Sequence, residues 1–209
     1  NVMNKMFAAL VGLGLANTAV PADAATVVFS GSRTNVDAPG PAAARCGSRA
    51  TGNIRHNPPT STSVGTSNFG AFTPTLSHCI QLPLSTTVPT PFDLGEFLFT
   101  FENGDTLTGT YSGTVTFLSP GLFSIVQTHI VTGGTGGLFG ATGTFDSSGQ
   151  LSFPGGRPTV QQSFAGRLNL PVPEPGTWMM MLLGFAAVGS ILRNSRRAEK
   201  FNPQAEAIV

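Results

Sequence analysis

The feature that most constrains the fold is a regular alternation of residue types after residue 93. In Glu96–Phe101 every second residue is phenylalanine, and Ser124–Val131 alternates in a similar way. Successive side chains on a strand point to opposite faces, so a period of two predicts strands. No amphipathic helical pattern precedes the C-terminal segment. The sequence therefore predicts an all-β fold, an antiparallel barrel or sandwich of short strands rich in glycine, threonine and phenylalanine.

One hairpin can be predicted to its register. A two-residue turn would pair Phe99 with Thr108 and set the phenylalanine face opposite small polar side chains. A three-residue loop, Glu102–Gly104, pairs Phe99 with Leu107 instead. Gly104 then takes the left-handed conformation, which favours a residue without Cβ. We predict the three-residue loop.

The chain before residue 93 differs in residue composition and pattern. Lys5 precedes the apolar run Met6–Ala16, and small residues at 22 and 24 precede Ala25. This pattern predicts a secretory signal peptide over residues 1–24, read by the Sec export machinery. Val27–Phe29 is a predicted first strand, whereas residues 35–91 are dense in Pro, Ser, Thr and Gly, which predicts surface loops. We therefore expect an N-terminal strand with loops over 25–92 and the antiparallel core over 93–170.

Charge and cysteine content narrow the possible partners. Residues 25–170 carry six arginines and six acidic residues, so no nucleic-acid partner is expected. Four of these arginines fall between Arg33 and Arg55, as either a solvated loop or a weak basic patch for an acidic polysaccharide. Cys46 and Cys79 are expected to form a disulfide in an exported protein. By the chain-entropy model it would contribute about 3 to 4 kcal/mol.

No catalytic residue, metal site or cofactor site is predicted. His78 lies beside Cys79, but the spacing is not that of zinc ligands. Adjacent side chains on a strand also point to opposite faces, which argues against a Cys–His pair. The glycine-rich run Thr132–Phe145 lacks the spacing of a nucleotide-binding loop. We predict instead a turn and short strand in which Leu138 and Phe139 close the end of a sheet.

The C-terminal segment contains a motif, an apolar stretch and a basic cluster. Pro173, Glu174 and Pro175 precede Trp178, and 18 uncharged residues separate Glu174 from the next charge. As a helix these would span roughly 27 Å, close to the hydrocarbon core of a bilayer. We predict a transmembrane helix at about 177–192. The basic cluster, which would hold residues 198–209 in the cytoplasm, consists of Arg193, Arg196 and Arg197.

This arrangement, over residues 171–197, resembles the PEP-CTERM sorting domain of Gram-negative bacteria. The resemblance implies recognition by an exosortase, a transpeptidase-like membrane enzyme. It also implies passage through the inner membrane to the cell surface or medium, often in bacteria that make exopolysaccharide. An ordinary C-terminal membrane anchor is the alternative, but it leaves the Pro-Glu-Pro triplet unexplained.

The central region resembles a second group of proteins. Thr132–Phe145, with Gly104–Tyr111, is similar to a pattern in allene-oxide-cyclase-like and dirigent-like β-barrels. The resemblance covers roughly Asp93–Leu170 and implies a barrel whose central cavity binds apolar ligands, with some members guiding a cyclisation. Leu138 occupies a position that is often Arg in the pattern, so no active site is carried over.

Two hypotheses for function follow. The first is a non-enzymatic β-domain delivered to the cell envelope or extracellular matrix, with exopolysaccharide as a candidate partner. The second is a secreted barrel enzyme or carrier with an apolar pocket lined by phenylalanines, in which Glu96, Glu102 or His129 acts as acid or base. An inward-facing Glu or His with a shifted pKa in a sizeable cavity would favour the second hypothesis, whereas a barrel filled with side chains would exclude it.

Overall fold

The alternating segments form long antiparallel strands. The computed structural model describes residues 24–37, 42–58, 61–172, 179, 181–190 and 193. Burial alternates along the later strands, which confirms the prediction of strands with one buried face. These strands follow one another as hairpins: β7 (Thr90–Phe101), β8 (Thr106–Ser119), β9 (Leu122–Thr135), β10 (Thr142–Ser152) and β11 (Thr159–Leu170).

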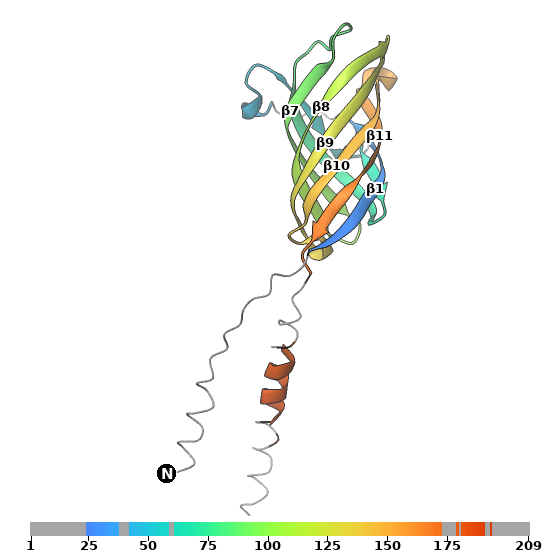
Figure 1. Cartoon of the computed structure of the whole chain (residues 1–209). Helices are drawn as coiled ribbons and strands as arrows, with labels where there is room; N and C mark the ends of the chain where they lie inside the picture. The colour runs from blue at the N-terminus through green and yellow to red at the C-terminus, as the bar shows by residue number, and fades with distance from the viewer. Residues whose placement is uncertain are drawn as a thin grey trace, which may run out of the picture. The chain divides into compact units, whose positions relative to one another are not determined.

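The rest of the wall comes from the N-terminal half of the domain. β1 (Ala25–Val36) pairs with β11 on one side and with β5 (Val64–Ser67) on the other. β6 (Gly70–Ile80) pairs with β5 and with β2 (Ala50–Ile54) along one edge, and with β7 along the other. The nine strands of this sheet, as far as the structure describes the chain, therefore close on themselves as a barrel (Figure 1). This closure decides between the predicted barrel and sandwich.

The expectation of surface loops for residues 35–91 is wrong over much of that range. Besides β2, β5 and β6, the range contains a small hairpin of β3 (His56–Asn57) and β4 (Ser61–Thr62). Pro74 lies inside β6, yet on one edge β5 pairs only with 70–72 and β2 only with 76–80. The proline thus occupies the gap between two partners, where the missing N–H interrupts no ladder on that edge. The division at residue 92 also fails, because 24–171 is one compact unit.

The predicted hairpin register is confirmed. Phe99 pairs with Leu107, and the strands are joined by a three-residue loop, Glu102–Gly104. The N–H of Phe101 donates to the carbonyl of Asp105 at 2.9 Å, and Gly104 has a φ of 87°. A residue with a Cβ would be strained in this left-handed conformation.

Aromatic rings and glycines pair across the strands of the barrel. Phe97 is the partner of Gly109, and Phe145 is the partner of Gly166. A Cβ at either glycine would overlap the ring or side chain of its phenylalanine partner and a neighbouring backbone carbonyl. The same arrangement joins Phe92 with Gly113, Phe72 with Gly65 and Tyr111 with Gly95. A barrel filled with large rings therefore needs glycine on the adjacent strand, which accounts for the abundance of both residues.

The glycine-rich run closes one end of the barrel. It contains the end of β9, the 3₁₀ turn η2 (Gly136–Leu138) and the start of β10. Leu138 is buried, as predicted, but Phe139 is 75% exposed, so only Leu138 closes the sheet. Two further 3₁₀ turns are η1 (Ala44–Cys46) and η3 (Pro154–Gly156). The expected disulfide is present and links Cys46 of η1 to Cys79 of β6.

The C-terminal segment contains helical residues at 179, 181–190 and 193. Across the part of the chain that the structure describes, no helix meets the length and hydropathy needed to cross a bilayer. The predicted helix at 177–192 lies partly outside the described residues. The signal peptide ahead of Ala24, the motif residues 173–175 and 178, Arg196, Arg197 and residues 198–209 lie wholly outside them.

Candidate functional site

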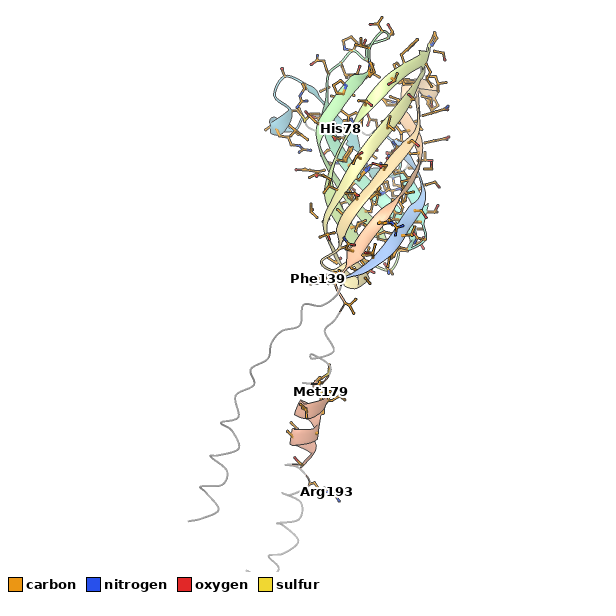
Figure 2. All side chains as sticks on the ribbon, in the orientation of Figure 1. His78, Phe139, Met179 and Arg193 are labelled. Carbon is orange, nitrogen blue, oxygen red and sulfur yellow. A yellow bond between two sulfur atoms is a disulfide. The ribbon has the colours of Figure 1, made fainter. Side chains whose placement is uncertain are left out.

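The two ends of the barrel interior differ in packing. The end with the 102–104 loop and η2, here called the filled end, contains closely packed phenylalanines. Phe29 lies 5.1 Å from Phe145 and 4.9 Å from Phe164 between ring centroids, and Phe97 lies 5.0 Å from Phe99. The opposite end, here called the open end, is bounded by the segments 81–89, 120–121 and 153–158. Figure 2 shows Phe139 at the filled end and His78 towards the open end.

The open end contains a cavity of about 470 Å³. This volume lies within the range of small-molecule sites, roughly 300 to 1,000 Å³. Most of the wall is apolar and comes from β2, β6, β8, β9, β10 and β11 and the adjoining loops. The apolar lining residues are Ile54, Ile80, Leu82, Leu84, Val115, Phe123, Ile125, Leu151, Phe153 and Val160.

Five polar side chains, from β1 and its end, β2, β6 and β9, also line the cavity: Asn35, Asp37, Thr51, His78 and Gln127. Asn35 is 2% exposed and Gln127 is 5% exposed. Burial raises the pKa of the Asp37 carboxyl to about 6, against the opposing effect of Arg157. The cavity therefore combines an apolar wall with a few polar groups, which is the usual composition of a ligand site.

A buried arginine lies next to this polar group. Arg33 shares a strand face with Asn35 and is only 3% exposed. Its Nη2 donates to Oε1 of Gln127 at 2.6 Å and to Nε2 of His129 at 3.1 Å, while its Nε donates to Oε1 of Gln162 at 3.0 Å. The guanidinium carbon also lies 5.3 Å from the ring centroid of Phe99. Burial lowers the pKa of Arg33 to about 10, so the group stays charged at neutral pH.

Several polar atoms around Arg33 have no hydrogen-bond partner among the residues that the structure describes. Nη1 of Arg33 and Nε2 of Gln162 are buried donors without an acceptor, and Oδ1 of Asn35 is a buried acceptor without a donor. Buried polar atoms in folded proteins are nearly always satisfied, and leaving one unsatisfied costs about 1 to 3 kcal/mol. The polar cluster is therefore incomplete without a further group.

His129 is inside the barrel, but its position does not suit a general base. Its ring stacks between Phe145, at 4.3 Å, and Tyr111, at 5.1 Å. Because an arginine can only donate, Nε2 of His129 must accept, and that lone pair is occupied by Arg33. Burial, together with the charge of Arg33, holds the pKa of His129 well below its usual range, and a backbone hydrogen bond at Phe145 opposes this only weakly.

His78 makes a separate contact with Tyr111. Nδ1 of His78 lies 2.8 Å from Oη of Tyr111, and burial, assisted by Arg45, lowers the pKa of His78 to about 4. Burial also raises the pKa of the Tyr111 hydroxyl above its usual range. Both groups are therefore neutral over the physiological range. Among the described residues no three His, Cys, Asp or Glu side chains gather as metal ligands.

The other residues considered from the sequence lie elsewhere. Glu96 is on the outside of the barrel, where its Oε2 lies 3.2 Å from Nη1 of Arg45, and Glu102 is exposed in the hairpin loop. Arg49 pairs with Asp93 at 2.6 Å. The four arginines from 33 to 55 therefore form no common patch, because one is inside the barrel and two are paired with acids.

Sequence reasoning missed the polar cluster although the signal was present. Ser124–Val131 was read as a strand, and its alternation places Gln127 and His129 on the same face as Ile125 and Val131. Likewise, Arg33 and Asn35 follow Phe29 at even spacing on β1. These polar residues share the face of buried apolar residues, and this pattern could have predicted a partly polar interior.

Comparison with known proteins identifies only the C-terminal segment. Residues 171–197 match the PEP-CTERM protein-sorting motif. This motif indicates an exported protein that is processed by an exosortase and sorted to the cell surface. No curated protein and no solved structure matches the chain. The likeness of the barrel to allene-oxide-cyclase-like and dirigent-like proteins therefore stays a prediction.

Proposed function

We propose that this protein is an exported, non-enzymatic binding barrel that holds a small amphiphilic molecule in its open end. The observation that carries the proposal is the contrast between one end filled with phenylalanines and another containing a cavity of about 470 Å³. Leu82 and Phe153 line the cavity and remain 51% and 37% exposed, so apolar surface continues to its rim. An apolar ligand would cover this surface and gain about 25 cal/mol for each Å² removed from water.

The test is native mass spectrometry on the full chain recovered from its host. We expect a small amphiphilic adduct on the wild-type protein and on Val126→Trp, but not on Ile125→Trp. Ile125 points into the cavity, while Val126 is on the opposite face of β9 and 50% exposed, so the two variants add the same bulk to opposite sides. An adduct that persists on Ile125→Trp at wild-type occupancy, with both variants folded, would disprove cavity binding.

A second function, a barrel enzyme, is favoured by two observations: the inward-facing His78 lines the cavity, and so does the carboxyl of Asp37. This carboxyl lines the cavity with a pKa of about 6, close to the value at which an acid or base works near neutral pH. Asp37→Asn would then abolish turnover of the bound molecule while leaving its binding intact. In the binding barrel, by contrast, the molecule leaves unchanged in both proteins.

We also propose a route by which the chain is exported and sorted. A signal peptide over 1–24 directs the chain to the Sec machinery, and an apolar helix at about 177–192 holds it in the inner membrane with the arginine cluster inside. The exosortase then cuts near 173–175. Support comes from the 18 uncharged residues between Glu174 and Arg193 and from the motif match.

Intact-mass measurement tests this route. We expect the surface or medium form to lack residues 1–24 and the helix after Trp178, and a variant with alanines at 173–175 to stay at the inner membrane with its tail. A full-length C-terminus on the surface form would reduce the tail to a plain anchor.

Exopolysaccharide association, the remaining part of the proposal, uses the outer wall. On β8, the inward side chains include the buried Leu107, Tyr111 and Val115. The outward side chains that alternate with them, from Thr106 to Thr116, all carry a hydroxyl group. Hydroxyls can donate to and accept from sugar hydroxyls. Co-sedimentation with the host polysaccharide tests this part of the proposal, and a chain that stays in the supernatant would contradict it.

A further inference from the structure

Among the described residues, the charge of Arg33 has no counter-ion inside the barrel. Its hydrogen-bond partners are two glutamines and a neutral histidine. Within the described part of the chain no carboxylate lies within salt-bridge distance of its guanidinium. Asp37 is four residues further along the same strand direction, roughly 13 Å away at 3.3 Å per residue, and so does not form an ion pair with it. A buried, unpaired charge is unfavourable and is normally compensated.

The charge lies next to the polar part of the cavity. Arg33 bonds directly to Gln127, whose side chain lines the cavity together with Asn35. The other boundary is the apolar rim at Leu82 and Phe153. The cavity is thus polar at depth, with a positive charge directly behind its polar wall, and apolar towards solvent. An amphiphile with an anionic head and an apolar body matches this order of environments.

We propose that the cavity binds an apolar monocarboxylate with its carboxylate inward, beside Gln127, Asn35 and Arg33. This inference rests on the proposed binding function and specifies its ligand class. The carboxylate would accept hydrogen bonds from the side-chain amides of Gln127 and Asn35, which line the cavity. Its charge would compensate the guanidinium of Arg33, which lies directly behind Gln127 and whose Nη1 has no acceptor among the described residues. Asn35 would turn its amide so that its NH₂ group, rather than Oδ1, faces the head group. Hydrogen bonds between ionised partners are the strongest of their kind.

The experiment compares three ligands with the same eight-carbon chain, namely octanoate, octan-1-ol and octylammonium, by titration calorimetry at pH 7. The full chain is used, and Ile125→Trp measures binding that does not involve the cavity. We expect octanoate to bind wild-type protein at least tenfold more tightly than octan-1-ol, with octylammonium weakest.

Arginine variants assign this preference to one side chain. Arg33→Met should bring octanoate and octan-1-ol to within about threefold of each other, and Arg33→Lys should restore part of the preference. Arg167→Met is the matched control, because it removes an exposed arginine from β11 with the same change in net charge. If Arg33→Met does not fold, the order of the three ligands on the wild-type protein still decides.

The possible results distinguish a failure of the carboxylate assignment from a failure of the proposed binding function. Octan-1-ol or octylammonium binding as tightly as octanoate would overturn the carboxylate assignment while leaving an apolar binding barrel. Binding of none of the three beyond that of Ile125→Trp would overturn both. A preference for octanoate that survives Arg33→Met in a folded protein would also overturn the role given to Arg33.

Discussion

The filled and open ends of this barrel are built from the same strands with the same alternation, yet their interiors differ. At the filled end the inward positions hold aromatic rings, several of them next to a cross-strand glycine, as in Phe97 with Gly109 and Phe145 with Gly166. Toward the open end the inward positions of β1 and β9 change to Arg33, Asn35 and Gln127. Alternation therefore determines the wall of the barrel, whereas the identity of the inward residues determines whether the interior is packed or contains a cavity.

The largest expected effect is a difference between two phenylalanine truncations. Phe145→Ala, at the filled end, should lower the free energy of unfolding by about 3 to 5 kcal/mol. The ring of Phe145 contacts several others, and these cannot move in to fill the cavity that its removal leaves. Phe123→Ala, at the cavity wall, should lower it by less than about 2 kcal/mol, because its ring already borders the cavity. Urea unfolding of both variants measures this. Equal losses would mean that the open end is packed like a core.

The disulfide should act mainly on the open end. Cys46 and Cys79 are 33 residues apart, and Cys79 pairs with Thr51 of β2, a strand that lines the cavity. Replacing both cysteines by serine should cost about 3 to 4 kcal/mol through the loss of loop closure. Hydrogen exchange should then rise in β2 more than in β10. A uniform rise over both strands would show that the bond holds the whole barrel rather than its open end.

The sequence predicted local features better than those that depend on closure of the barrel. The 102–104 hairpin was predicted to its register because two neighbouring strands and one glycine determine it. β6 was missed because it lies in a stretch dense in Pro, Ser, Thr and Gly, and its Pro74 is compatible with a strand only where the neighbours β5 and β2 leave a gap. Arg33 and Gln127 are 94 residues apart, and only closure brings them to 2.6 Å. The C-terminal motif was recognised because the order of its residues along the chain defines it.

Asp37 and His78, both at the open end, should have opposite effects on the pH dependence of stability. The pKa of Asp37 is raised from 3.8 to about 6, so the folded state binds the extra proton and stability falls as pH rises through that interval. The pKa of His78 is lowered from 6.5 to about 4, so its contribution rises with pH over nearly the same interval. His129 has the sign of His78. The stability of the wild type should therefore still rise between pH 4 and 6, but less steeply than it would without the opposing effect of Asp37.

Asp37→Asn removes the contribution to stability that falls as pH rises. Above pH 6.5 it should raise the free energy of unfolding by up to roughly 3 kcal/mol, because no charge is then desolvated at that position. Between pH 4 and 6 the stability of the variant should climb more steeply than that of the wild type. Unfolding measured at four pH values from 4.5 to 7.5 checks both expectations. Parallel profiles for the two proteins would show that Asp37 does not titrate in this interval.

The smallest expected effect concerns the turns at the two ends. Gly104, in the filled-end hairpin, has a φ of 87°, and Gly121, between β8 and β9 at the open end, has a φ of 77°. No atom lies within 4 Å of an added Cβ at either position, so Gly→Ala should introduce only backbone strain, about 1 kcal/mol in each case. The two ends would then differ in their interiors and not in their turns. A loss at Gly121→Ala several times that at Gly104→Ala would instead show that the β8–β9 turn is coupled to the cavity wall, so that the open end resists deformation as one unit.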